Sequence, residues 1–209
     1  MTHAHRHGPV AVVGGVPIPV HELDAREARL RDGPLASALP FAGTGEGRQL
    51  RRWLTQLIVT ERVVGADFAA RGLSTDDAAA EDDLLPDITA RLEIGSIAAA
   101  ALADPRARAL FGCVTADVNV SDDDVAAYYE RNPLRFTGSR SDDHGWRAPA
   151  VSVPPLAEVR PMIAEHLRAV ARRRAFRLWL DRRRAELVRL SPGYEHPGDP
   201  RQPDNTHRH

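Results

Sequence analysis

The amino-acid sequence predicts a mainly α-helical protein with a short N-terminal β-hairpin and a long C-terminal helix that packs back on the rest. Three observations lead to this fold class. Hydrophobic residues make up 43% of the 209 residues but aromatic residues only 5%, which favours helices packed through small and aliphatic side chains. Apolar residues recur at helical spacing over long segments. Two short apolar runs separated by two glycines lie near the start of the chain.

The N-terminal segment predicts the hairpin and the first helix. Residues 10–13 and 16–19 are largely apolar, and the Gly14–Gly15 pair between them favours a tight two-residue turn. A helix is expected over residues 20–31. Residues 32–47 are rich in Gly, Pro and Ala, so we interpret them as a loop.

The middle of the chain predicts a series of helices. The strongest covers residues 49–71 and carries an apolar stripe at spacings of three and four. The stripe consists of Leu50, Trp53, Leu54, Leu57, Ile58, Val64 and Phe68. A second helical segment, residues 76–94, contains Pro86, which predicts a kink or break. A third, residues 95–111, is expected to restart near Asp104–Pro105.

The C-terminal half predicts two more helices. Ser121 and Asp124 fit the N-cap and N3 positions of a capping box, so a helix is expected from there to Asn132. The last helix, residues 156–190, measures roughly 50 Å at the standard rise per residue. It must therefore bridge two packing units or leave part of its apolar face exposed. Its apolar stripe contains Leu156, Val159, Ile163, Leu167, Val170, Phe176, Trp179, Leu180, Leu187 and Leu190.

These elements suggest five regions along the chain. Residues 1–9 form a His-rich, disordered arm. Residues 10–136 form a helical domain, and residues 137–153 are a polar linker. Residues 154–190 hold the long helix that completes the domain, and residues 191–209 are an extended tail rich in His and Pro, without periodicity.

Charge and composition argue against several classes of partner. The net charge of −1 gives no overall attraction to nucleic acid or anionic lipid. Residues 156–190 carry ten Arg against four acidic residues, but residues 74–124 carry twelve acidic residues against three Arg. Such complementary segments favour internal pairing over a phosphate-binding groove. No apolar run is long enough for a membrane span or a secretory signal, so a cytoplasmic location is expected.

Few residues suggest chemistry. The sequence contains no phosphate-binding loop, no nucleophile elbow and no helical pair of His ligands. The single cysteine, Cys113, lies in an apolar run and is interpreted as a small buried residue. The histidines of the two termini form a candidate site for Ni, Cu or Zn, with a plain polar arm as the alternative. These histidines are His3, His5, His7, His196, His207 and His209.

Several segments, in this order, resemble the parvulin-linked peptidyl-prolyl isomerase chaperones of the SurA, PrsA and PpiD type. The opening Val10–Leu23 resembles their strand, turn and first helix, and Leu54–Ser74 resembles the helix that follows. The most specific match is Val120–Phe136, which resembles the element that leads into their isomerase domain. The last helix, from Leu156, resembles the strap that returns to their N-terminal domain.

This resemblance implies polypeptide binding without isomerase activity. A parvulin domain needs roughly 90 residues to bury its own core, and residues 137–153 are too few to hold one. The resemblance therefore implies a non-catalytic chaperone or assembly factor, with an unfolded or partly folded polypeptide as its client. One member of the group assists a metalloprotein, so by analogy the client could be a metalloenzyme. The alternative is a metal-delivery protein that uses its His-rich termini.

The long helix and the N-terminal helices are expected to leave an apolar cleft for the client. The candidate walls are Leu50, Trp53, Leu57, Phe176 and Trp179. For each of these residues the alternative interpretation is an ordinary place in the hydrophobic core.

Overall fold

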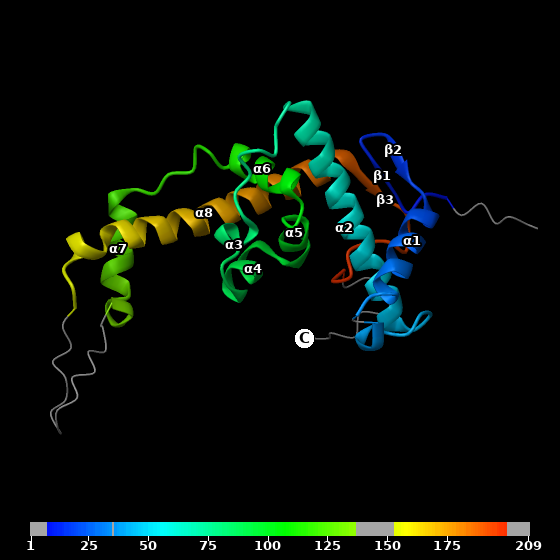
Figure 1. The fold of residues 1–209 in the computed structure, drawn as a ribbon, viewed down its shortest axis with the longest axis horizontal. Coiled ribbons are helices and arrows are strands. Elements are labelled where there is room, and N and C mark those ends of the chain that lie inside the picture. Colours follow the sequence, from blue (N-terminus) through cyan, green and yellow to red (C-terminus); the bar gives the residue numbers. More distant parts are fainter. Residues whose placement is uncertain (1–7, 35, 137–152, 200–209) are drawn as a thin grey trace, which may run out of the picture.

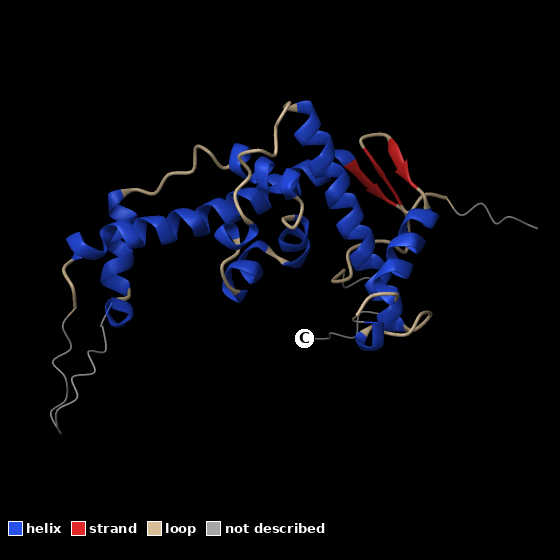
Figure 2. Ribbon diagram, in the orientation of Figure 1, coloured by secondary structure: helices blue, strands red, loops and turns tan. Residues whose placement is uncertain are grey.

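The computed structural model describes residues 8–34, 36–136 and 153–199. Over these residues the protein is mainly helical with one small antiparallel sheet, as the sequence predicts. Figure 1 shows an elongated molecule in which α8 runs along much of its length. Helix α7 crosses α8 at one end, and the strands lie at the other end beside α1 and α2 (Figure 2).

The described elements have the following bounds. In chain order they are β1 (Ala11–Val13), β2 (Val16–Ile18), α1 (Val20–Arg31), the 3₁₀ turn η1 (Ala36–Ala38), α2 (Gly45–Ala70), α3 (Glu81–Leu84), α4 (Ile88–Ile94), α5 (Ser96–Ala101), α6 (Pro105–Val114), α7 (Asp122–Arg131), the 3₁₀ turn η2 (Pro133–Phe136), α8 (Leu156–Leu187) and β3 (Val188–Leu190).

The sheet joins the two ends of the described chain. Strands β1 and β2 form the predicted hairpin, and both turn glycines have positive φ, 56° at Gly14 and 85° at Gly15. Strand β3 pairs with the other side of β1, so the strand order is β2-β1-β3. The sequence prediction was wrong here, because residues 188–190 were assigned to the last helix. Pairing with a distant strand overrides the local apolar spacing.

Helix boundaries follow the capping side chains. Helix α2 begins at Gly45 rather than at residue 49, because the Thr44 hydroxyl accepts a hydrogen bond from the Gly47 N–H at 3.0 Å. The expected helix start at residue 76 was also wrong. Ser74 accepts from the Asp76 N–H at 3.1 Å within a turn, and the first helix of this segment is α3.

Other local predictions are confirmed. The chain breaks between α3 and α4 beside Pro86, and α6 starts anew at Pro105. Ser121 and Asp124 form the predicted capping box at the start of α7. Cys113, by contrast, is exposed rather than buried, and its Sγ lies 3.8 Å from Nη1 of Arg71. The buried face of α6 consists of Ala107, Leu110 and Phe111.

Helix α8 bridges two hydrophobic clusters. Its C-terminal half contributes Phe176, Trp179 and Leu180 to the main core, which is built largely on α2, α5 and α6. Its N-terminal half contributes Ile163 to a smaller cluster with Val125 of α7 and with Phe136. A long helix can be stable in this position because each end has a packing partner.

Ion pairs also connect α8 to the acidic segment of the chain. Arg160 lies 2.6 Å from Asp122, and Arg173 lies 2.8 Å from Glu93. This agrees with the internal pairing predicted from the charge distribution. Among the described helices, none combines the length and the apolar character needed to cross a bilayer.

Two glycines of α2 give a matched test of this packing. A Cβ on Gly47 would lie 2.3 Å from the carbonyl oxygen of Phe41, whereas a Cβ on Gly65 would have no atom within 4 Å. We expect Gly47→Ala to lower the free energy of unfolding by about 2 kcal/mol. We expect Gly65→Ala to raise it by about 0.5–1 kcal/mol through helix propensity. Urea unfolding followed by circular dichroism measures both, and effects of the same sign would contradict the close approach at Phe41.

Candidate functional site

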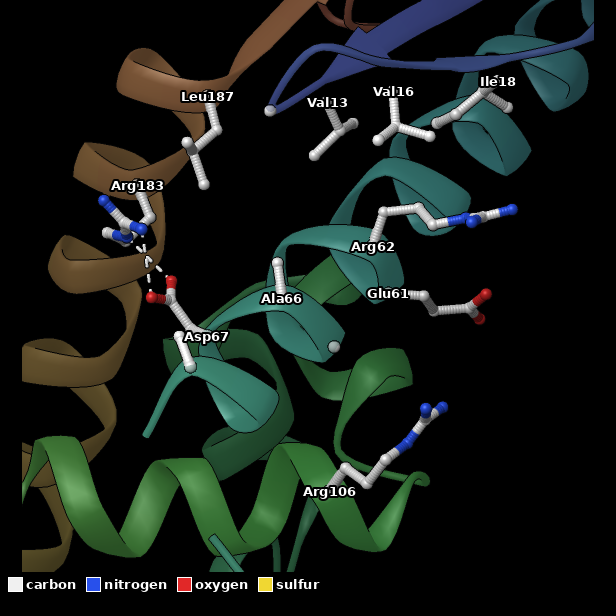
Figure 3. Close-up of a pocket in the computed structure, with 13 residues that line it drawn as sticks. Val13, Val16, Ile18, Glu61, Arg62, Ala66, Asp67, Arg106, Arg183 and Leu187 are labelled. Carbon is white, nitrogen blue, oxygen red and sulfur yellow. Dashed lines mark hydrogen bonds and ion pairs between the residues drawn. The ribbon is translucent and has the colours of Figure 1, made fainter. Parts of the chain in front are cut away.

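A surface cavity lies where the hairpin, α2 and the end of α8 meet. It has a volume of about 680 Å³. In Figure 3 the hairpin lies above α2 and turns the side chains of Val13, Val16 and Ile18 toward it, while α8 closes one side. We call this cavity the hairpin groove. It is lined by Val13, Gly14, Val16, Ile18, Glu61, Arg62, Gly65, Ala66, Asp67, Ala70, Arg106, Arg183 and Leu187.

The roof and floor of the hairpin groove are apolar. Val13 and Val16 are paired across the hairpin, so both side chains project from the same face of the sheet. Val16 is 58% exposed although its side chain points into the groove. On the floor, Gly65 and Ala66 belong to α2 and present little side-chain volume. The space above α2 therefore follows from the combination of a hairpin roof and small floor residues.

A bidentate ion pair closes the groove on the α8 side. The Arg183 Nε lies 2.7 Å from one Asp67 oxygen, and its Nη2 lies 3.0 Å from the other. Asp67 and then Glu186 accept hydrogen bonds from Arg183 and thereby raise the pKa of this guanidinium. The Asp67 side chain is 9% exposed and that of Arg183 is 30% exposed, so the carboxylate is shielded from solvent, and the pair holds α8 against α2.

Three charged side chains lie on the opposite, open side. Glu61 and Arg62 come from α2, and Arg106 comes from α6 (Figure 3). The hydrogen bonds that Arg106 donates to Asp104 raise the pKa of Arg106 and lower the pKa of the Asp104 carboxyl. Both shifts favour the charged forms of this ion pair, so Arg106 and Asp104 remain charged at neutral pH.

The free edge of β2 is poorly suited to adding another strand. The Ile18 carbonyl turns toward β1, where it accepts a hydrogen bond from the Val10 N–H at 2.8 Å. By alternation, the backbone groups of Pro17 point away from β1. Proline has no N–H to donate, so the hairpin offers a new strand only an acceptor there. A client strand therefore cannot form a full set of backbone hydrogen bonds at this edge.

The predicted client-binding residues do not line this groove. Phe176 is 0% exposed, Leu57 6% and Trp179 9%, so these three lie in the protein interior. Leu50 and Trp53 are partly buried and pack against the main core. The expectation that Phe176 lines a client cleft is the one most clearly corrected, because a fully buried ring cannot form the wall of an open cleft.

Sequence reasoning missed the groove residues for a physical reason. The sequence predicts Val16 and Ile18 as strand residues and residues 49–71 as a helix, but it does not show that this helix lies beneath the hairpin. Ala66 and Ala70 lie on the side of α2 away from its apolar stripe, and Gly65 lies at the border of that stripe, two turns after Ile58. The only sequence signal for the groove was a group of small residues close together on α2. Such a group does not by itself show that a hairpin lies over it.

Of the six predicted metal-binding histidines, only His196 lies within the described residues. Partial burial and then the nearby Arg184 lower the pKa of its imidazole. Its Nδ1 accepts a hydrogen bond from the Gly198 N–H at 3.0 Å. Within the described ranges, no group of three or more His, Cys, Asp or Glu side chains is placed to hold a metal ion. The other five histidines lie outside these ranges.

The described part of the tail packs on the protein itself. The Gly193 carbonyl accepts from Arg52 at 3.3 Å, and the Tyr194 carbonyl accepts from Gln56 at 3.0 Å. The Ser191 N–H donates to the Val10 carbonyl at 3.0 Å, beside the end of the sheet. The start of the C-terminal tail is thus anchored next to the start of the N-terminal hairpin.

Fold and groove together define a mainly helical protein with a small sheet and a surface groove of the size typical of ligand sites. A family model described as "Family of unknown function (DUF7158)" matches residues 9–46. This match covers the hairpin, α1 and the first residues of α2. No curated protein and no solved structure matches the chain.

Proposed function

We propose that the protein is a non-catalytic chaperone or assembly factor that binds client polypeptides in the hairpin groove. The observation that carries this proposal is an apolar groove of about 680 Å³ with Val16 left 58% exposed at its roof. The sequence resemblance to the parvulin-linked chaperones of the SurA type supports the same class of function. The proposal moves the client site away from the residues that the sequence suggested.

The hydrophobic effect provides the affinity in this proposal. An aliphatic side chain that enters the groove contacts Val13 and Val16 from above and Ala66 from below. Burying one such side chain contributes about 1.5–3 kcal/mol. The pleated hairpin turns alternate side chains toward the groove, so an extended client segment can place every second side chain against it.

The charged groups of the groove favour binding over catalysis. Both carboxylates already accept hydrogen bonds from guanidinium groups, Asp67 from Arg183 and Glu61 from Arg26 at 2.7 Å. Such pairs hold helices in place and offer no free general base to a substrate. We expect no proline isomerisation above the uncatalysed rate in a proline-peptide assay.

A charge placed in the groove should weaken client binding. We expect Val16→Asp to weaken binding of a labelled, permanently unfolded apolar polypeptide about tenfold, because the variant loses one apolar contact and adds a charge that must be desolvated. Fluorescence anisotropy measures this change. The matched control is Leu92→Asp, which alters a 73% exposed residue of α4 outside the groove and should leave binding unchanged. Equal affinity for both variants would contradict the groove as the client site.

The alternative function is metal binding or delivery through the histidines at the two termini. One observation supports it. Ser191 donates through its backbone N–H to Val10 and through its hydroxyl to Pro9, so the C-terminal tail begins beside the N-terminal end of the described chain. Titration with Ni, Cu or Zn before and after deletion of residues 1–7 and 200–209 tests it. Micromolar binding that disappears on deletion would favour metal delivery. Client binding that survives deletion would favour the chaperone function, whether or not the client is a metalloenzyme.

A further inference from the structure

The open side of the hairpin groove carries two arginines that are more exposed than their partners. Figure 3 shows Arg62 and Arg106 extending on the same side of the groove, opposite Arg183. The Arg62 side chain is 48% exposed and that of its partner Glu22 is 31% exposed. The Arg106 side chain is 52% exposed and that of Asp104 is 27% exposed. In each pair the guanidinium is therefore the member that faces solvent.

Both guanidiniums keep donors for a ligand. A guanidinium has five N–H donors. Among the described residues, Arg62 donates only from Nη2, to Glu22 at 2.8 Å. Arg106 donates from Nε and Nη2 to Asp104, which leaves Nη1 available. Exposed ion pairs of this kind are weak, so a ligand carboxylate can compete for these donors.

The carboxylate between them already has a partner of its own. Glu61 lies between Arg62 and Arg106 in Figure 3, but it is bound by Arg26 of α1 at 2.7 Å. Asp67 is shielded and held by Arg183 through both oxygens. The groups that a ligand meets first at the open side are thus an apolar roof at Val16 and two guanidiniums.

We propose that the hairpin groove selects extended apolar segments that carry acidic side chains next to the apolar residues. This inference rests on the polypeptide-binding function proposed above and names the class of segment that it takes. The apolar residues occupy the space beneath the hairpin, and the flanking carboxylates accept charge-assisted hydrogen bonds from Arg62 and Arg106. Pro17 leaves the β2 edge without a backbone N–H donor at this position. The donors that the groove offers to such a segment are therefore the guanidiniums, which favour acidic side chains.

Three labelled peptides test the proposal on the full-length protein. They share the apolar centre Val-Thr-Leu-Thr-Val and differ only in flanks of Glu, Gln or Arg. We expect the Glu-flanked peptide to bind about fivefold more tightly than the Gln-flanked peptide, and the Arg-flanked peptide to bind most weakly. In the double variant Arg62→Gln, Arg106→Gln the preference for Glu should vanish, while affinity for the Gln-flanked peptide changes less than twofold. High salt should reduce the preference in the unaltered protein.

The control variant is Arg91→Gln with Arg160→Gln, which removes two comparably exposed arginines outside the groove. It should keep the preference for Glu, and thermal unfolding verifies that both double variants are folded. Equal binding of the Glu and Gln peptides, or a preference that survives in the Arg62 and Arg106 variant, would overturn this inference and leave the chaperone proposal standing. No binding of any peptide would instead overturn the chaperone proposal.

Discussion

Replacing Phe176 with Ala is expected to destabilise the protein by about 3–5 kcal/mol, as for other fully buried aromatic residues. Phe176 is 0% exposed. Its ring centroid lies 5.1 Å from that of Phe111 on α6 and 5.5 Å from that of Trp179 one turn along α8. Removing the ring leaves a cavity between α8 and α6 and removes both aromatic contacts. The midpoint of thermal unfolding should fall by about 10 °C.

The neighbouring residue Leu178 provides the control for this prediction. Leu178 lies two positions along α8 and is 48% exposed. We expect Leu178→Ala to cost less than about 1 kcal/mol, because little apolar area returns to water. Chemical denaturation of both variants, followed by tryptophan fluorescence and circular dichroism, gives the two values. Similar small losses would mean that α8 does not pack into the core through Phe176.

Local signals explain the parts of the fold that were predicted correctly. The helix over residues 20–31 and the capping box of Ser121 and Asp124 depend on side chains that are close in sequence. The long helix α8 also follows from a local apolar period, although residues 188–190, the last three of the predicted helix, form β3 instead. The capping side chain at Thr44 was present in the sequence, but the surrounding Gly residues obscured the start of α2.

The groove depends on contacts between distant residues, which the sequence does not show. Val16 and Leu187 are remote in sequence and line the same groove only because β3 follows α8 directly and pairs with β1. The predicted client residues were chosen because they are large and apolar. In a helical protein with few aromatic residues, those side chains are needed in the core, as Phe176 demonstrates. The surface residues that remain for binding are smaller and carry a weaker sequence signal.

Removing Glu93 should cost nearly as much as removing a core side chain. Arg173 is 6% exposed at its side chain and donates to Glu93 at 2.8 Å and to the Leu84 carbonyl at 3.3 Å. Glu93→Ala leaves this charge inside the protein with one weak acceptor. Because Glu93 is itself 32% exposed, solvent screens part of the interaction. We therefore expect a loss of about 2–3 kcal/mol in urea unfolding.

Removing Arg173 instead of Glu93 should cost less stability. The difference between the two substitutions tests whether the Arg173 charge is buried. Arg173→Met removes the buried charge and fills a similar volume, while Glu93 can turn toward water, so we expect a loss of about 1 kcal/mol. The double variant should then be more stable than Glu93→Ala alone. Arg160→Gln, in an exposed pair, should cost less than about 0.5 kcal/mol. If Glu93→Ala were as mild as Arg160→Gln, Arg173 would have to reach water, and the contact between α4 and α8 would differ from the one described.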